Sequence, residues 1–168
     1  RINKTKKDFD KVNLSVIIEK VQEDLDTRIK ESGATIVVDN LPILNAIPFQ
    51  MEQLFNNLLS NAIKYRGMED PKIIIDCKKL KRNEITDNFI KKSKAYYRIS
   101  VLDNGIGFAQ EHSEKIFELF QRLHQNDEYS GTGIGLAICK KIVQNHSGYI
   151  LAESEPGKGS SFCIYLPA

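Results

Sequence analysis

A strand-like segment that ends in a carboxylate and two glycines constrains this chain more than any other part of it. Residues 97–102 (YRISVL) have the β-branched and aromatic side chains typical of a strand, and they lead directly into DNGIG at 103–107. Asp103 can accept hydrogen bonds, and Gly105 and Gly107 let the backbone approach a flat ligand where a Cβ atom would collide. Because Asp-Asn-Gly is also a common tight turn, this stretch alone is compatible with an ordinary turn and with a ligand-binding turn.

Length and composition predict one soluble globular domain. The chain has 168 residues, of which 41% are hydrophobic and 27% charged, enough for a core of its own. A net charge of +2 is too small to predict a nucleic-acid partner. The apolar runs are too short to span a membrane, so we expect a cytoplasmic domain of a soluble or membrane-anchored parent protein. Cys77, Cys139 and Cys163 lie in apolar segments at unrelated spacings, which predicts free thiols rather than a zinc site or a disulfide.

The N-terminal third predicts a helix followed by two strands. Residues 1–11 are basic and polar and are interpreted as a linker or the tail of a preceding element. Asn13 is a plausible N-cap for a helix that Gly33 would end. Residues 34–38 and 43–47 have the composition of strands.

A second helix is predicted from Pro48 to about Tyr65. Beside its apolar face lie Asn57, Asn61 and Lys64, because spacings of four and three fall on one side of a helix. Polar residues beside an apolar face are commonly just solvated. Two asparagines in the middle of a helix lower its propensity, however, which favours another role.

The segment 78–94, between a strand at 73–75 and the strand at 97–102, is rich in lysine and arginine. It is interpreted as a long connection between hairpin strands, and a basic docking surface is the alternative.

The C-terminal half predicts, in order, a short helix at 113–123, a polar loop at 125–131, a helix that starts in GTGIG at 131–135 and ends at Gly148, and a hairpin of strands 149–154 and 161–166.

Exposed N–H groups of a glycine-rich helix start can bind phosphate. The glycine run lacks the lysine of a P-loop and does not follow a strand as in a dinucleotide site. Asn61 offers an oxygen suited to Mg²⁺, Lys64 and Arg122 can neutralise phosphate charge, and Asp103 can accept from an amino group such as that of adenine.

Four motifs in this order resemble the catalytic ATP-binding domain of sensor histidine kinases, in the GHKL superfamily that also includes gyrase, ATP-dependent chaperones and mismatch-repair ATPases. Residues 57–65 (NLLSNAIKY) are similar to its N box and 103–107 (DNGIG) to its first glycine box. Residues 116–120 (IFELF) are similar to its F box and 131–136 (GTGIGL) to its second glycine box. The run 117–124 is particularly similar to phytochrome-like sensor kinases.

The resemblance implies a two-layer α/β sandwich of the Bergerat type, with a mixed sheet, helices on one face and an ATP lid at about 109–130. It implies that residues 12–168 are the catalytic domain and that 1–11 link it to a helical dimerisation domain. The implied activity is transfer of the γ-phosphate of ATP, with Mg²⁺, to a histidine on that separate domain.

The resemblance also implies a role for individual residues. Asp103 would bind the adenine amino group, with Gly105 and Gly107 against the base, and Asn61 would hold Mg²⁺. The residues implied at the phosphates or flanking the nucleotide are Asn57, Lys64, Tyr65, Arg122, Gly131, Thr132, Gly133, Gly135 and Leu136. Of these, Asn57, Lys64 and Arg122 are the implied catalytic residues, while Phe117 and Phe120 would anchor the lid.

Asn57 separates two branches of the superfamily. Gyrase-type ATPases carry a glutamate at this position, where it activates the attacking water. An amide cannot act as a general base, so efficient hydrolysis is disfavoured and the γ-phosphate would be kept for a side-chain acceptor.

The acceptor histidine is expected outside this chain, because His112, His124 and His146 all lack a phosphoacceptor sequence context. The implied partners are the parent's own histidine-bearing dimerisation domain and the receiver domain of a response regulator, in a two-component phosphorelay without nucleic acid. A homodimeric full-length protein and a monomeric fragment are expected. Two alternatives remain: a nucleotide-binding module without kinase activity, and an anti-sigma-type serine kinase, which the N-terminal stretch and the phytochrome-like lid sequence disfavour.

Overall fold

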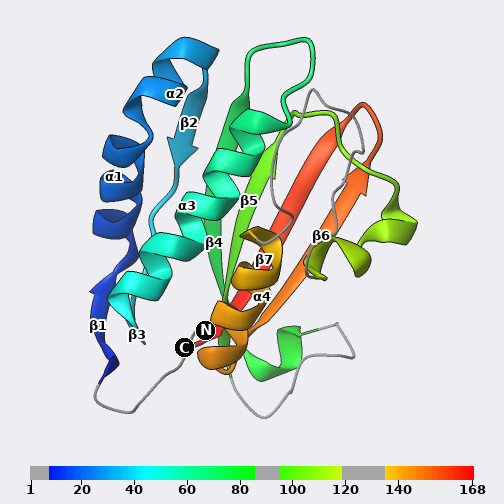
Figure 1. The fold of residues 1–168 in the computed structure, drawn as a ribbon. Coiled ribbons are helices and arrows are strands. Elements are labelled where there is room, and N and C mark those ends of the chain that lie inside the picture. Colours follow the sequence, from blue (N-terminus) through cyan, green and yellow to red (C-terminus); the bar gives the residue numbers. More distant parts are fainter. Residues whose placement is uncertain (1–7, 86–94, 119–134) are drawn as a thin grey trace.

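The computed structural model describes residues 8–85, 95–118 and 135–168, and it has two layers. One layer is a five-stranded mixed sheet, and Figure 1 shows the helices on one face of it. β2 runs parallel to β4, and the pairs β4–β5, β5–β7 and β6–β7 are antiparallel. The order across the sheet is β2 (Thr35–Val38), β4 (Lys72–Leu80), β5 (Tyr96–Asp103), β7 (Gly159–Pro167) and β6 (Tyr149–Glu155). The predicted two-layer α/β architecture is confirmed.

The helical layer consists of α1 (Leu14–Asp24), α2 (Asp26–Ser32), α3 (Pro48–Lys64) and α4 (Gly135–Asn145). Asn13 caps α1 as predicted, since its side chain accepts a hydrogen bond from the Ser15 N–H. Gly33, at φ 72°, ends α2 as predicted. The single helix expected between them is wrong in one respect, because the backbone of the buried Leu25 (ψ 9°) separates α1 from α2.

The helices and the sheet enclose the main core. Along β4 and β5 the residues Ile73, Ile75, Ile99 and Val101 face the helices and are almost fully buried. A second, smaller cluster of Leu80, Ile85, Tyr96 and Tyr165 lies on the opposite face, because side chains alternate along a strand. The sheet therefore buries apolar side chains on both faces, with most of them under the helices.

A two-stranded ribbon of β1 (Asp10–Asn13) and β3 (Ile43–Ala46) lies beside the helical layer. Four residue pairs, from Asp10 opposite Ala46 to Asn13 opposite Ile43, form the ribbon. The strand β3 was expected, but β1 was not, because the sequence DKVN has little strand propensity. Pairing with β3 and burial of Val12 stabilise β1 instead.

Two other predicted elements are corrected. Residues 78–80 belong to β4, where they pair with residues 96–98 of β5, so the connection begins later than expected. The described part of the helix predicted at 113–123 is not α-helical. It contains the 3₁₀ helix η4 (Lys115–Phe117), which follows η3 (Gln110–His112) and ends where Glu118 is extended. Burial of the adjacent Ile116 and Phe117 in the core takes precedence over helix propensity here. Residues 86–94 and 119–134, including the rest of the basic segment and of the predicted lid, lie outside the described residues.

The end of α4 differs from the prediction by one residue. Ser147, not Gly148, adopts the left-handed conformation, at φ 56°. The Ser147 N–H donates to the Gln144 carbonyl and the Gly148 N–H to the Val143 carbonyl, which is the hydrogen-bond pattern of a Schellman cap. Gly148 is required for a different reason, because a Cβ atom there would strike the carbonyl oxygen of Tyr165.

This arrangement predicts opposite effects for two neighbouring substitutions. Ser147→Gly removes the strain of a left-handed residue and is expected to raise the free energy of unfolding by about 1 kcal/mol. Gly148→Ala forces two backbones apart and is expected to lower it by about 1–3 kcal/mol. Urea denaturation of both variants measures the two changes. A destabilised Ser147→Gly together with a tolerated Gly148→Ala would show that Gly148 is the left-handed residue.

Candidate functional site

The C-terminal half of α3 presents the polar residues predicted from the sequence. Asn57, Asn61 and Lys64 are each half-buried at the border of the apolar face. Within the part of the chain that the structure describes, the Asn61 side-chain amide makes no hydrogen bond, so its oxygen is available to a ligand. The Lys64 ammonium lies 5.2 Å from the centre of the Tyr65 ring, which keeps this cation at the end of the helix.

Asn57 contacts the start of α4. Its Nδ2 donates to the Gly135 carbonyl oxygen over 3.2 Å. Burial raises the pKa of the nearby Cys139 thiol to about 12, and a hydrogen bond with the Asn57 side chain partly opposes this shift. Asn57 therefore links α3 to the N-terminus of α4, where Gly135 is half-buried and Leu136 is buried.

Asp103 ends β5 and turns its carboxylate towards its own loop. Oδ1 accepts a hydrogen bond from the Gly105 N–H over 2.9 Å. Burial raises the pKa of the Asp103 carboxyl group above its usual value, and hydrogen bonds from the backbone N–H groups of Gly105 and Ser160 oppose the shift. A carboxylate has about four lone-pair positions, so Asp103 retains acceptor capacity for a ligand.

The two glycines of the turn 103–107 are required by contacts within the protein. A Cβ atom on Gly105 would strike the carbonyl oxygen of Tyr65, at the end of α3. Gly107 has φ 68°, and a Cβ atom there would strike the carbonyl oxygen of Glu155. The sequence suggested that these glycines make room for a flat ligand. The structure shows that they let the turn fit between two backbone segments, and the contact with a ligand stays a prediction.

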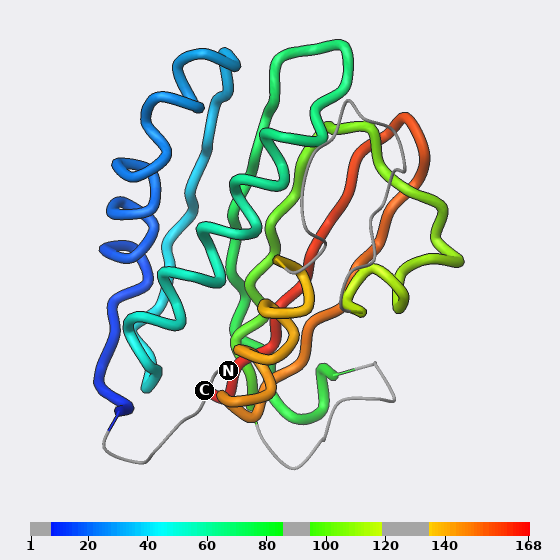
Figure 2. Tube along the Cα trace, in the orientation of Figure 1, coloured from blue at the N-terminus to red at the C-terminus, as the bar shows by residue number. Residues whose placement is uncertain are grey.

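Those two segments hold the turn 103–107 from opposite sides. The Ile106 N–H donates to the Tyr65 carbonyl oxygen (3.0 Å), and the Ile106 carbonyl accepts from the Gly157 N–H (2.7 Å). Figure 2 shows the α3–β4 connection and the turn between β6 and β7 at the same end of the sheet as the end of β5. The structure thus brings Asp103, Gly105 and Tyr65 together from separate parts of the sequence.

The start of the predicted lid is anchored in the core. Phe117 is buried, and its ring lies edge-on to Phe162 with 6.2 Å between centroids. Phe108, also buried, lies against the same ring at 6.4 Å. Phe117 therefore lies in the core, and its role as an anchor of the lid stays a prediction. Other predicted residues lie outside the described residues, namely Phe120, Arg122, Gly131, Thr132 and Gly133.

A group of buried polar residues at the far end of α3 and α4 was not predicted. His146 Nε2 accepts from the Ile47 N–H (3.0 Å), and its Nδ1 lies 2.7 Å from the Ile142 carbonyl oxygen. This geometry requires a neutral imidazole with the proton on Nδ1. Nearby, Asn145 donates to Gln50 over 3.2 Å. No local sequence signal marks the His146–Ile47 and Asn145–Gln50 pairs, because the partners are 99 and 95 positions apart in the chain.

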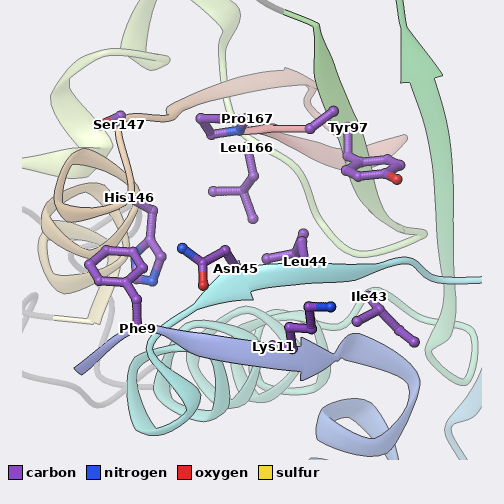
Figure 3. Close-up of a pocket in the computed structure, with 11 residues that line it drawn as sticks. Phe9, Lys11, Ile43, Leu44, Asn45, Tyr97, His146, Ser147, Leu166 and Pro167 are labelled. Carbon is purple, nitrogen blue, oxygen red and sulfur yellow. The ribbon is translucent and has the colours of Figure 1, made fainter. Parts of the chain in front are cut away.

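Two hollows in the described structure lie away from the α3 amides. One, of about 610 Å³, is at the His146 end, where the rings of Phe9 and His146 lie 5.2 Å apart and Asn45 and Tyr97 line the wall (Figure 3). The other, of about 560 Å³, touches Asp103, but its wall includes Glu153 and Glu155, whose carboxylates would repel phosphate. The best candidate site is instead the surface between the end of α3, the turn 103–107 and the start of α4.

The described residues of this site could hold a metal ion only together with a ligand. Among the described residues no cluster of three or more His, Cys, Asp or Glu side chains could bind a metal. Asn61 supplies one neutral oxygen, which fits Mg²⁺ bound mainly by phosphate oxygens and water.

In the described part of the chain no helix is long and apolar enough to cross a bilayer.

The chain is similar to known proteins over most of its length. Residues 46–168 match the family of histidine kinase-, DNA gyrase B-, and HSP90-like ATPases. The chain is 43% identical over 151 residues to the phytochrome-like protein Cph1 of Synechocystis sp. and 43% identical over 159 residues to cyanobacterial phytochrome A of Nostoc sp.. These matches cover 90% and 95% of this chain but 18% and 19% of the relatives, so the chain spans less than a fifth of their length.

Solved structures agree with the sequence relatives. The catalytic domain of histidine kinase ThkA superposes with a TM-score of 0.71 at 28% sequence identity, and the match covers 95% of both chains. The match therefore extends over nearly the whole chain.

The position of Asp103 predicts a pH-dependent gain in stability when its charge is removed. The pKa of this carboxyl group is raised by folding, so the folded protein binds the proton more tightly than the unfolded chain. The charged carboxylate therefore lowers the free energy of unfolding at pH 7. This effect disappears as the pH falls to the pKa of the carboxyl group in the unfolded chain, which is about 4. Asp103→Asn is expected to raise the free energy of unfolding at pH 7 and to change it less at pH 4.

Urea denaturation of the ligand-free protein at both pH values measures this effect. Asp24→Asn, at the exposed end of α1, is the matched control and is expected to change stability little. A loss of stability in Asp103→Asn at pH 7 would show that the carboxylate is structural.

Proposed function

Because the chain belongs to the family of histidine kinase-, DNA gyrase B- and HSP90-like ATPases, we propose that it binds ATP with Mg²⁺ between Asp103 and α3. As the ATP-binding catalytic domain of a sensor histidine kinase, it transfers the γ-phosphate of ATP to a histidine. The observation that supports this best is the position of Asp103. Its carboxylate is held by backbone N–H groups at one side of the site. The other side carries Asn61, whose side-chain amide makes no hydrogen bond among the described residues.

Asp103 is proposed to select the base. A half-buried carboxylate is an acceptor for the exocyclic amino group of adenine, and low exposure to water strengthens that hydrogen bond. We propose Gly105 and Gly107 against the base, as the family resemblance implies, in addition to their close approach to Tyr65 and Glu155. Tyr65, whose carbonyl oxygen holds the turn, is proposed to lie beside the nucleotide.

The residues of α3 and α4 are proposed to hold the phosphates. Asn61 would contribute one oxygen to Mg²⁺, and Lys64 would neutralise phosphate charge. The N-terminus of α4, with Gly135 and Leu136, offers N–H groups and the positive end of a helix dipole. Mg²⁺ held there would neutralise part of the phosphate charge. We also propose Arg122, Gly131, Thr132 and Gly133 at the phosphates, as the family resemblance implies.

The chain is proposed to donate phosphate to a side chain rather than to water. Hydrolysis needs a general base beside the γ-phosphate, and Asn57 is an amide whose Nδ2 is already hydrogen-bonded to the Gly135 carbonyl. In phosphoryl transfer, positioning and charge neutralisation provide most of the catalysis. Asn57, Lys64 and Arg122 are therefore proposed to orient the phosphates.

The acceptor is proposed to lie on a separate domain. His146 is buried and both of its ring nitrogens contact backbone groups, so it cannot receive a phosphoryl group in the folded state. His112 is exposed, but it lies beside Glu111, whose carboxylate would repel the incoming phosphate. We propose that residues 1–11 lead to a histidine-bearing dimerisation domain of a homodimeric, cytoplasmic kinase. A receiver domain would take the phosphoryl group from that histidine, and the isolated fragment would be monomeric.

Asn61→Ala is expected to remove the contribution of Mg²⁺ to ATP binding. Calorimetry should show ATP affinity reduced by about 1–3 kcal/mol with Mg²⁺ present and little changed in EDTA. Ser60→Ala is the matched control, because the Ser60 hydroxyl donates to the Asn57 carbonyl of its own helix. An equal loss of affinity with and without Mg²⁺ would contradict the proposed role of Asn61.

Phosphotransfer is tested by adding the histidine-bearing domain of the full-length parent in trans with ³²P-labelled ATP. Acid-labile phosphohistidine is expected on the added domain, with little labelling of the fragment alone. Phosphoserine would indicate a serine kinase, and rapid release of inorganic phosphate would indicate a hydrolase. Binding of ATP without either reaction would indicate a nucleotide-binding module without kinase activity.

A further inference from the structure

A side chain, that of Asn104, continues the hydrogen bonding at the end of the β4–β5 ladder. Backbone pairing between these strands stops at Ile73 opposite Asp103. The next N–H group, that of Lys72, donates instead to the side-chain Oδ1 of Asn104 over 2.8 Å. The Nδ2 of the same amide donates to the Asp70 carbonyl oxygen over 3.1 Å. The Asn104 side chain thus extends the sheet by one residue and joins the turn after Asp103 to the α3–β4 connection.

The segment to which Asn104 is joined is itself held firmly. Arg66 donates through one terminal nitrogen to the Ser32 carbonyl at the end of α2 (2.8 Å) and through the other to the Asp70 carboxylate (2.9 Å). The guanidinium group therefore ties residue 70 to a different helix. Asn104 is anchored on a braced segment rather than on a free loop.

The contacts of the turn differ in what they fix. Ile106 is held through its backbone on both sides, at the far end of the turn from Asp103. Asn104 directly follows Asp103 and, in the described part of the chain, is the residue of the turn whose side chain bonds to the α3–β4 connection. Loss of its amide would release the backbone beside the carboxylate while the Ile106 hydrogen bonds remain.

We propose that Asn104 is a positioning residue for base recognition, which holds the Asp103 carboxylate where it meets the amino group of a 6-aminopurine nucleotide. This inference rests on the proposed function. Recognition of a base by one carboxylate depends on its placement, and a shift of about 1 Å is enough to lose most of a directional contact. Loss of Asn104 should therefore weaken the contact with the amino group and leave the phosphate contacts on α3 and α4 unchanged.

A pair of nucleotides separates these effects. ATP and purine riboside triphosphate differ only in the 6-amino group, which is hydrogen in the latter. Their affinities with Mg²⁺ are measured by calorimetry for the wild-type chain and for Asn104→Ala. The wild-type chain is expected to prefer ATP by about tenfold or more, as for one hydrogen bond to a charged group. Asn104→Ala is expected to reduce ATP affinity about tenfold and to leave the affinity for the analogue within about twofold.

Asn13 provides a control of the same residue type outside the site. Its Oδ1 also accepts from a backbone N–H group, that of Ser15 at the start of α1 (3.0 Å). Asn13→Ala is expected to keep the preference for ATP over the analogue. Asn104→Asp is the second variant, for the case that Asn104→Ala does not fold. It keeps the acceptor for Lys72 but places an oxygen against the Asp70 carbonyl, and it should also reduce the preference.

The outcomes distinguish this inference from the proposed function. A wild-type chain that binds both nucleotides equally would overturn the proposed role of Asp103. A wild-type preference that survives in Asn104→Ala, or in Asn104→Asp if the alanine variant is unfolded, would overturn the positioning role alone. Equal loss of affinity for both nucleotides would likewise show that Asn104 only supports the fold.

Discussion

The contact of the turn 103–107 with two other backbone segments is the constraint on which the rest of the site depends. The turn lies between the end of α3, at Tyr65, and the β6–β7 connection, at Glu155, and it fits there because Gly105 and Gly107 have no side chains. These contacts fix Asp103 relative to α3 before a ligand arrives. Preorganisation of this kind lowers the entropy lost on binding. It also accounts for the half-buried carboxylate of Asp103, which is less favourable for folding than an exposed one.

α3 connects the core to the site because one face of the helix packs in the core and the border of that face carries the polar residues of the site. Leu54, Phe55, Leu58 and Leu59 are almost fully buried against the sheet and the other helices, which sets the rotation of the helix about its axis. That rotation places Asn57 and Asn61 at the border of the apolar face. At the far end of the helix, the neutral His146 and the Gln50–Asn145 pair tie α4 to α3. These buried hydrogen bonds hold the N-terminus of α4 in place beside Asn57, some helical turns away.

Local chemistry in the sequence was enough for most of the elements and for the choice of the candidate site residues. Asn13, Gly33 and Pro48 mark helix ends by their own conformational preferences, and the structure confirms each of them. Predictions were wrong where packing outweighed these preferences. Ser147 rather than Gly148 takes the left-handed conformation, since Gly148 is needed for its close approach to Tyr165. Residues 115–117 form a 3₁₀ helix because Ile116 and Phe117 are both drawn into the core.

The sequence by itself determined which side chains are available to a nucleotide, since the chemistry of Asp103, Asn61 and Lys64 and their spacing along single elements are local properties. The tertiary structure alone decided what surrounds them. The Asn104 side chain is hydrogen-bonded to two residues that lie 32 and 34 positions earlier in the chain. The His146 side chain is hydrogen-bonded to a residue that lies 99 positions earlier. Such contacts form only when the sheet closes around the helices. No periodicity within one segment encodes them, because each requires the geometry of two segments at once.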